Sequence, residues 1–323
     1  MPGNPNIPKA AIRKMSKGNA LELLLQVDRD KTARDRVLSM ENAFRDRIDT
    51  HVASLPSHSA PLIKFNTSPF VLMIYARERG YSRVSEIERD ILQAKLFSSM
   101  ETSAGRMVQS VVLPFFGWED VESKMTSSSS VLDGRKLDGA ILRLATIKSG
   151  PRCLNDEMSK DIADDIVGHV EEWASDARVD HVDFVYGVLY GTEKLSNKKD
   201  WHILRNVVEG KGARFMLEDP KDKWTCSFRN RGTRVDVTVR IGIDWWSYLG
   251  GKTCLSEVLA ALIRASVPPS NAEASAQKYL ISDLGRIVSL APIPKGYNIS
   301  LLQRGQLQWF FLLLSHYCDV LED

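Results

Sequence analysis

The chain has 323 residues, of which 43% are hydrophobic and 26% charged, and its net charge at neutral pH is +2. These values are typical of a globular protein, and the length predicts two domains or one enlarged domain. No segment approaches 18 uninterrupted apolar residues, which argues against a membrane span, and residues 1–19 lack the apolar core of a signal peptide.

Basic residues are concentrated in two segments. Residues 1–47 contain ten Lys/Arg against six Asp/Glu, and residues 193–240 contain twelve against seven. Residues 48–192 contain fifteen against twenty-one. Basic flanks around an acidic centre are typical of a protein that contacts phosphates at its edges and a cation in the middle, although an ordinary solvated surface gives the same pattern.

The first third of the chain is predicted to be helical. Residues 1–19 are expected to form a frayed basic arm, and residues 20–50 carry apolar positions at helical spacing, which predicts one or two amphipathic helices. After a Pro/Ser-rich connection at 55–69, another helix is expected from Phe70 to near Gly80.

A long helix is expected next. Ser85 and Glu88 have the spacing of a capping box, and the helix they open should run to about Val112, before Pro114. Small residues surround Glu101 within this helix, which indicates that another element packs closely there. Residues 117–136 form a serine-rich polar loop, which we expect to become partly ordered on ligand binding.

The centre of the chain predicts a sheet. Asp138–Leu142 and Leu144–Lys148 are interpreted as neighbouring strands, and Asn155 or Asp156 caps the helix that follows. Residues 181–191 are apolar on both faces, as expected of a central strand covered by helices on both sides. This order predicts an α/β fold with a mixed sheet flanked by helices.

The remainder predicts more strands and then helices. Short strand-like segments at 213–217, 224–228 and 235–241 are separated by basic turns. An aromatic cluster follows at 243–249, with Trp245 and Trp246 expected to be core residues. Helices are expected near 253–267, 271–290 and 300–321. We therefore divide the chain into an N-terminal helical region (1–83), a sheet-containing core (84–250) and a C-terminal helical region packed on the core (251–323).

Asp138 and Lys148 are the first candidates for chemistry. If they lie on neighbouring strands, both side chains reach one end of the sheet. A carboxylate there can bind Mg²⁺, which prefers oxygen ligands, and a nearby lysine can orient or deprotonate a water molecule. Glu101 is the candidate for a second oxygen ligand. The alternative is a turn aspartate and a solvated lysine at a strand end.

Several ordered pieces of the sequence resemble the type II restriction endonucleases of the PD-(D/E)xK superfamily, in particular the TdeIII-like group that cuts interrupted G/C palindromes such as GGNCC or CCNGG. The resemblance covers roughly residues 66–250. Its pieces are Asn66–Phe70, Glu101–Gly105, Leu137–Gly139, Ile147–Pro151 with Asn155 and Met158, Val185–Gly191, Ile203–Arg205 and Trp245–Leu249.

The resemblance implies Asp138 as a metal ligand, Lys148 as the catalytic lysine and Glu101 as an acid that joins the Mg²⁺ site, together with the carbonyl of Ile147. Thr146 stands where the second acid of the motif is expected.

The charge missing at Thr146 must come from elsewhere in the chain. Glu101 is the first choice, Asp161 on the following helix is the second and Asp133 is the third.

Two groups of residues are candidates for contacts with DNA. Ser149, Arg152 and Asn155 lie just beyond Lys148, where an arginine can bond guanine and a helix start attracts phosphate, although Arg152 and Asn155 can equally be a surface turn residue and a helix cap. The second group is better suited to phosphates than to bases: Lys198, Lys199, Arg205, Arg229, Arg231 and Arg234.

The expected function is Mg²⁺-dependent, site-specific cleavage of double-stranded DNA that leaves 5′-phosphates. A palindromic site implies a homodimer, and the family implies a cognate DNA methyltransferase in the same system. Four widely spaced cysteines without a CxxC pair favour free thiols and a cytoplasmic location. The alternatives are a structure-specific repair or resolution nuclease of the same superfamily and a non-catalytic DNA-binding protein.

Overall fold

A computed structural model of the chain describes residues 10–55, 69–121, 131–211, 214–216, 224–269, 280–294, 296–297 and 299–323. Parts of several expected features lie outside these ranges: residues 1–9 of the basic arm, residues 56–68 of the Pro/Ser-rich connection, residues 122–130 of the serine-rich loop and residues 271–279 of an expected helix. None of the described helices is both long enough and apolar enough to cross a membrane.

Seven strands form one mixed sheet in the order β2-β3-β4-β5-β8-β7-β6. The strands are β2 (Glu119–Asp120), β3 (Gly134–Asp138), β4 (Ile141–Lys148), β5 (His181–Val188), β6 (Arg214–Met216), β7 (Trp224–Asn230) and β8 (Thr233–Ile241). β4, β5 and β8 are parallel, and the outer pairs are antiparallel. The expected mixed α/β sheet is confirmed, with β5 at its centre.

The strand prediction around Asp138 is wrong. Asp138 and Ile141 are directly opposite each other at the closed end of the β3–β4 hairpin, and β4 continues without a break to Lys148. Two strands at 138–142 and 144–148 would leave Arg143 alone to reverse the chain, whereas the tightest common hairpins need two loop residues. Gly139 occupies the loop with φ of 59°, a conformation that favours glycine.

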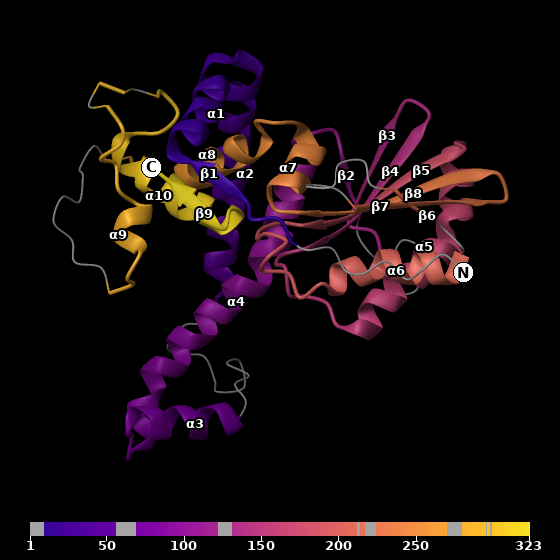
Figure 1. The fold of residues 1–323 in the computed structure, drawn as a ribbon. Coiled ribbons are helices and arrows are strands. Elements are labelled where there is room, and N and C mark those ends of the chain that lie inside the picture. Colours follow the sequence, from indigo (N-terminus) through magenta and orange to yellow (C-terminus); the bar gives the residue numbers. More distant parts are fainter. Residues whose placement is uncertain are drawn as a thin grey trace.

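Two helices cover one face of the sheet. Figure 1 shows α5 (Asp156–Ala177) and α6 (Lys199–Lys211) side by side beneath the strands. Asn155 caps α5 as expected, because its side chain accepts a hydrogen bond from the Met158 amide at 2.8 Å. The apolar strip of α5, from Ile162 to Trp173, packs on the apolar side chains of β4 and β5 and forms a core with them.

The N-terminal and C-terminal helical regions share a second core beside the sheet. It combines α1 (Lys17–Arg29), α2 (Lys31–Ser54), α7 (Ile243–Gly250), α8 (Cys254–Ser266), α9 (Leu284–Ile287), α10 (Arg304–Leu314) and the 3₁₀ turn η2 (Ser315–Tyr317). The chain ends are joined by parallel pairing of β1 (Lys14–Ser16) with β9 (Val320–Glu322). The expected frayed arm is therefore wrong from Lys14 onwards, and the last expected helix ends as a strand.

Trp245 and Trp246 link this second core to the sheet. Both are buried, as expected of core residues, and the Trp246 indole N–H donates to the Leu189 carbonyl at 2.8 Å. A Cβ at Gly187 would lie 2.5 Å from the Trp245 ring, so only glycine lets α7 sit this close to the centre of the sheet.

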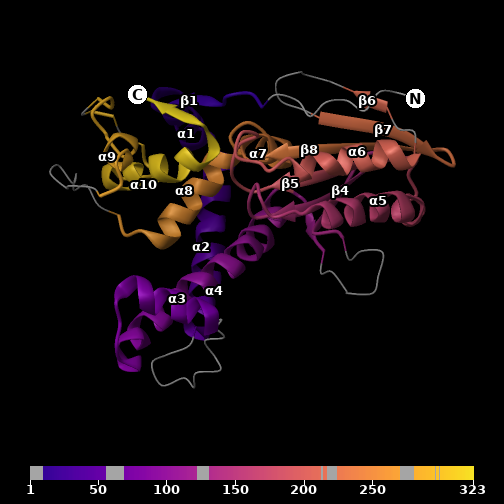
Figure 2. The same ribbon diagram turned by 60° about the horizontal axis from the view of Figure 1, so that its bottom comes forward.

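A helical arm projects from this body. It consists of α3 (Pro69–Arg79) and the first half of α4 (Val84–Phe115), and Figures 1 and 2 both show it extending away from the sheet and the other helices. The expected capping box of Ser85 and Glu88 is wrong, because α4 begins at Val84 and the Glu86 carboxylate accepts the Ser82 and Arg83 amides. The helix also includes Pro114 in its last turn, where the missing N–H interrupts only the final hydrogen bonds.

Candidate functional site at the end of β4

Asp133, which precedes β3, contacts the end of β4. Its Oδ2 accepts the Ile147 amide at 2.7 Å, and its own amide donates to the Ala145 carbonyl at 2.8 Å. Lys148 is the next residue after Ile147 and the last of β4. Because of these two bonds, the carboxylate of Asp133 lies at the end of the strand that carries the lysine.

Burial and the nearby positive charges shift the pKa of the Asp133 carboxyl in opposite directions. Desolvation raises the pKa of the Asp133 carboxyl, and the nearby Asp120 carboxylate acts in the same direction. The Ile147 amide and the positive charges of Lys148 and Arg106 lower it, but the net shift is upward. Acids with a perturbed pKa beside a cation are frequent at functional sites and also occur in structural ion pairs, so the position of Asp133 beside Lys148 makes it a candidate.

Thr146 is buried and has a structural partner. Its hydroxyl donates to the Val131 carbonyl at 2.5 Å, and 2% of the residue is exposed. This hydrogen bond therefore holds Val131, two residues before Asp133, against β4. At the position where an acid was expected, the chain has a residue that positions another acid.

Asp138 lies at the opposite end of β4 from Lys148. The expectation that the two side chains meet is wrong, since Ile141, the partner of Asp138, is seven residues before Lys148. At a rise of about 3.3 Å per residue, this separation is about 23 Å. The Asp138 carboxylate is exposed and pairs with Arg143 at 2.8 Å, which is consistent with the alternative of a turn aspartate.

Glu101 lies on α4 where this helix passes the end of β4. A Cβ on Gly105 would lie 3.1 Å from the Ser149 Cβ, so the small residue expected from the sequence does permit a close approach. Glu101 is one helical turn before Gly105 and, with Ser149, lines a cavity of about 420 Å³. Tyr190 also lines this cavity. The structure therefore brings Glu101 to the same end of β4 as Lys148.

The other expected metal ligands are less well supported. Asp161 is exposed on α5, where burial and, to a smaller extent, the charge of Asp161 raise the pKa of Asp165. Ile147 lies beside Asp133, but through its amide and not its carbonyl. Within the described residues, no group of three or more His, Cys, Asp or Glu side chains could hold a metal ion.

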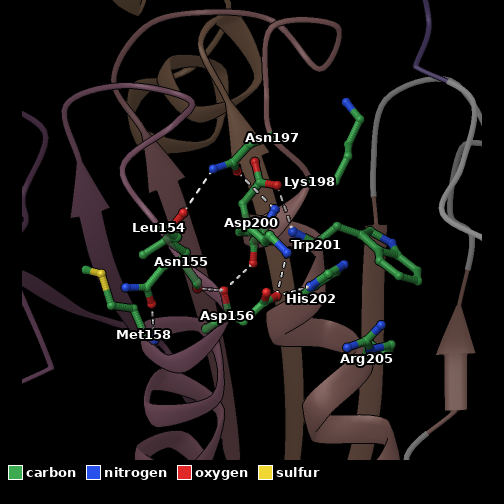
Figure 3. Close-up of polar contacts among 12 residues, drawn as sticks. Leu154, Asn155, Asp156, Met158, Asn197, Lys198, Asp200, Trp201, His202 and Arg205 are labelled. Carbon is green, nitrogen blue, oxygen red and sulfur yellow. Dashed lines mark hydrogen bonds and ion pairs between the residues drawn. The ribbon is translucent and has the colours of Figure 1, made fainter.

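The loops after β4 and β5 are fastened to each other. Arg152 Nε donates to the Leu195 carbonyl at 3.0 Å, and the Asn197 side-chain amide donates to the Leu154 carbonyl at 2.9 Å. Figure 3 shows these loops with the starts of α5 and α6. Arg152 therefore has the structural role of a turn residue, and it is exposed at the surface.

Asp156 joins the starts of α5 and α6. Its Oδ1 accepts hydrogen bonds from Lys199 Nζ at 2.6 Å and pairs with His202 Nδ1 at 3.0 Å (Figure 3). These partners lower the pKa of the Asp156 carboxyl. Lys199, expected to contact phosphate, is thus already paired with an acid.

The remaining expected phosphate contacts are distributed over the surface. Lys198 Nζ donates to the Glu193 carbonyl, and Arg205 lies 3.7 Å from Glu209. The basic residues of the β7–β8 hairpin are Arg229, whose Nη1 donates to the Gly232 carbonyl, Arg231, which pairs with Glu171, and Arg234, which pairs with Asp236. The structure does not gather these cations around Lys148.

Sequence reasoning missed the Arg106–Asp120 pair and gave Asp133 the lowest rank. Arg106 Nη1 lies 3.0 Å from Asp120 Oδ1, and Nη2 donates to Oδ2 at 3.2 Å. The signal for Asp133 was available, because it precedes Thr146-Ile147-Lys148 by a distance that a hairpin can close. No comparable signal marked Arg106 or Asp120, since their meeting depends on how α4 crosses β2.

The comparisons with known proteins add no family. A scan against protein-family models finds no match, and no curated protein is detectably similar in sequence.

Proposed function

We propose that the protein is a Mg²⁺-dependent type II restriction endonuclease of the PD-(D/E)xK superfamily that cleaves both strands of DNA at a short interrupted palindrome. The observation that carries the proposal is the contact of Asp133 with the end of β4, beside Lys148, across two adjacent strands. This contact replaces Asp138 by Asp133 as the first acid of the site. The proposed location is the cytoplasm, where a cognate methyltransferase protects the host DNA.

Lys148 and Asp133 have complementary tasks in hydrolysis of a phosphodiester. As an ammonium, Lys148 orients the attacking water and offsets negative charge that develops on the phosphate, whereas deprotonation of the water needs its neutral amine. Asp133 supplies an anionic oxygen whose direction is fixed by the Ile147 amide. The water adds in line with the leaving 3′-oxygen, so the phosphate stays on the 5′ end of the downstream fragment.

The acids at the end of β4 fit Mg²⁺ in part. This ion takes oxygen ligands, keeps several waters and commonly uses only one or two carboxylates plus substrate phosphate. Asp133 and Glu101 are the carboxylates that would hold it, while the Thr146 hydroxyl is directed at Val131. When bound, the ion lowers the pKa of a coordinated water and stabilises the pentavalent phosphate.

The exposed surface of the arm supports the homodimer. Several large apolar side chains of α3 and α4 are exposed, among them Phe70 at 78%, Ile74 at 70% and Phe97 at 63%. Of the described side chains between 70 and 108, none is buried. An apolar surface of this kind favours association, and a single site per chain requires two copies to cut both strands of a palindrome. Light scattering should therefore give twice the chain mass, and Phe70→Glu with Phe97→Glu should give the monomer.

One observation favours a non-catalytic DNA-binding protein as the second candidate. Thr146 leaves the site with one acid fewer than the superfamily pattern, and its hydroxyl is occupied by the Val131 carbonyl. A protein of this kind would bind duplex DNA with unchanged affinity after Lys148→Ala and would not cut it under any conditions.

Plasmid digestion tests the proposed function. Purified protein with Mg²⁺ should cut a sequenced plasmid into discrete fragments, whose mapped ends give the recognition site. Asp133→Asn and Lys148→Ala should abolish cutting. Asp138→Asn is the matched control, because it alters the same type of residue about 23 Å away along β4, and it should keep nearly full activity.

Three results would contradict the proposal or its site. Cutting confined to branched DNA would support a structure-specific nuclease instead. Loss of cutting in Asp138→Asn with retention in Asp133→Asn would restore the site expected from the sequence. A fully active Glu101→Ala protein would remove Glu101 from the metal site, and separate testing of Asp161→Ala would then decide the remaining acid.

A further inference from the structure

Arg106 is a partly exposed cation at the edge of the candidate site. It lies on α4, and 45% of its side chain is exposed although both terminal nitrogens contact Asp120. A guanidinium carries five N–H donors, and only the Nη2 contact with Asp120 Oδ2 is a hydrogen bond, while the Nη1 contact is an ion pair without hydrogen-bond geometry. Each terminal nitrogen therefore keeps at least one hydrogen for another acceptor.

The position of Arg106 is fixed by its neighbours on both sides. Gly105 packs against Ser149, so α4 approaches the residue after Lys148 as closely as a helix backbone allows. Asp120, on β2, is directly opposite Gly134, which follows Asp133 in the chain. These contacts hold the guanidinium next to the strand pair that carries the candidate acid and lysine.

The charge of Arg106 reaches Asp133. It lowers the pKa of the Asp133 carboxyl, as does the charge of Lys148, so two cations flank one partly buried acid. Lys148 has a compact ammonium on a flexible stem and can orient the attacking water. Arginine does not release its proton near neutral pH, and its planar fork matches the geometry of a phosphate. The two cations are therefore suited to different tasks.

We propose that Arg106 binds the backbone phosphodiester of the DNA strand being cut, with Asp120 positioning its guanidinium. This inference rests on the proposed endonuclease function and adds a catalytic residue from α4 to it. The free hydrogens of the terminal nitrogens contact a non-bridging phosphate oxygen and stabilise the charge that grows there during attack by water. No proton is transferred to or from Arg106 in this role.

Two variants separate phosphate binding from a merely structural tie between α4 and β2. Arg106→Gln removes the cation, and Asp120→Ala breaks the same ion pair while keeping the cation. If Arg106 contacts phosphate, Arg106→Gln lowers kcat/KM for cleavage on the order of 10²-fold. Asp120→Ala then lowers kcat/KM by a clearly smaller factor. Equal losses in the two variants, with equal losses of thermal stability, would overturn the proposal.

The pair formed by Arg135 and Glu119 provides the control. These residues are cross-strand neighbours on the same two strands, their side chains lie 2.8 Å apart, and both are more than half exposed. Arg135→Gln therefore removes a cation that is comparably exposed and also pairs with an acid of β2, but that lies on β3 and not on α4. It should leave kcat/KM close to the wild-type value, and a loss as large as that of Arg106→Gln would overturn the specific role of Arg106.

Binding of duplex DNA in EDTA makes the test independent of cleavage. The slope of log affinity against log salt concentration counts phosphate contacts, so Arg106→Gln should reduce it by about 1, whereas Asp120→Ala should not. An unchanged slope for Arg106→Gln overturns the proposal, even if Lys148→Ala shows that the chain is a nuclease. If the wild-type protein binds but never cuts, the endonuclease function fails and the slope alone decides on Arg106. If the wild-type protein neither binds nor cuts DNA, both proposals fail.

Discussion

The hydroxyl of Thr146 makes the sharpest prediction for the candidate site. Thr146→Val keeps the shape of the side chain and removes the donor to the Val131 carbonyl, which leaves that carbonyl unpaired. Because Thr146 is buried, water cannot replace the donor, and the expected loss of stability is about 1–3 kcal/mol. The same change releases the segment before Asp133, so cleavage should fall by more than the stability loss explains.

A second buried threonine provides the matched control for Thr146→Val. Thr238 is 3% exposed, and its hydroxyl lies 3.1 Å from the hydroxyl of Thr225, away from the end of β4. Thr238→Val should cost a similar free energy of unfolding in urea without a loss of cleavage at temperatures where both variants are folded. The reasoning is refuted if Thr146→Val has the same urea midpoint of unfolding as the wild type. It is also refuted if Thr146→Val and Thr238→Val lose cleavage equally.

Three further predictions concern charge and burial. Because the pKa of Asp133 is raised in the folded protein, its ionisation costs stability as the pH rises from the ordinary carboxyl pKa through the raised value. Asp133→Asn should therefore have a larger free energy of unfolding in urea than the wild type at pH 7. The difference should vanish near pH 3, where both side chains are neutral. Arg36→Met should cost about 3–5 kcal/mol in urea unfolding, because it leaves the fully buried Glu257 without its ion-pair partner. Only Cys153 has an exposed thiol, so a thiol reagent should label the native protein rapidly at one site, and Cys153→Ser should remove that rapid phase.

Most elements could be predicted because they depend on local patterns. The apolar strip of α5 and its Asn155 cap, the doubly buried strand β5 and the amphipathic α1 and α2 each follow from residues close together in the chain. The paired ends β1 and β9 could not be predicted in this way. Each has three residues, and they join positions 14 and 320, which no window along the sequence connects.

The candidate site was predicted in part for the same reason. Lys148 and Glu101 were found because strand ends and small residues in helices leave local signals, and the structure brings both to the end of β4. Asp133 was ranked too low because its contact with Ile147 depends on the register of the β3–β4 hairpin. Register is set by the partner strands, and a shift of one residue would turn every side chain of β4 to the other face.

The error over the first acid comes from a repeated tripeptide, Leu-Asp-Gly, at 132–134 and again at 137–139. Both copies carry the Asp-Gly pair that is typical of hairpin turns. The second copy forms the turn, and β4 begins where its pairing with β5 begins, from Ile141 opposite His181 to Lys148 opposite Val188. A turn at the first copy would start the following strand earlier and leave residues 135–140 beyond the end of β5. The observed turn places Asp138 in the solvent and leaves Asp133 at the end of the strand that carries Lys148.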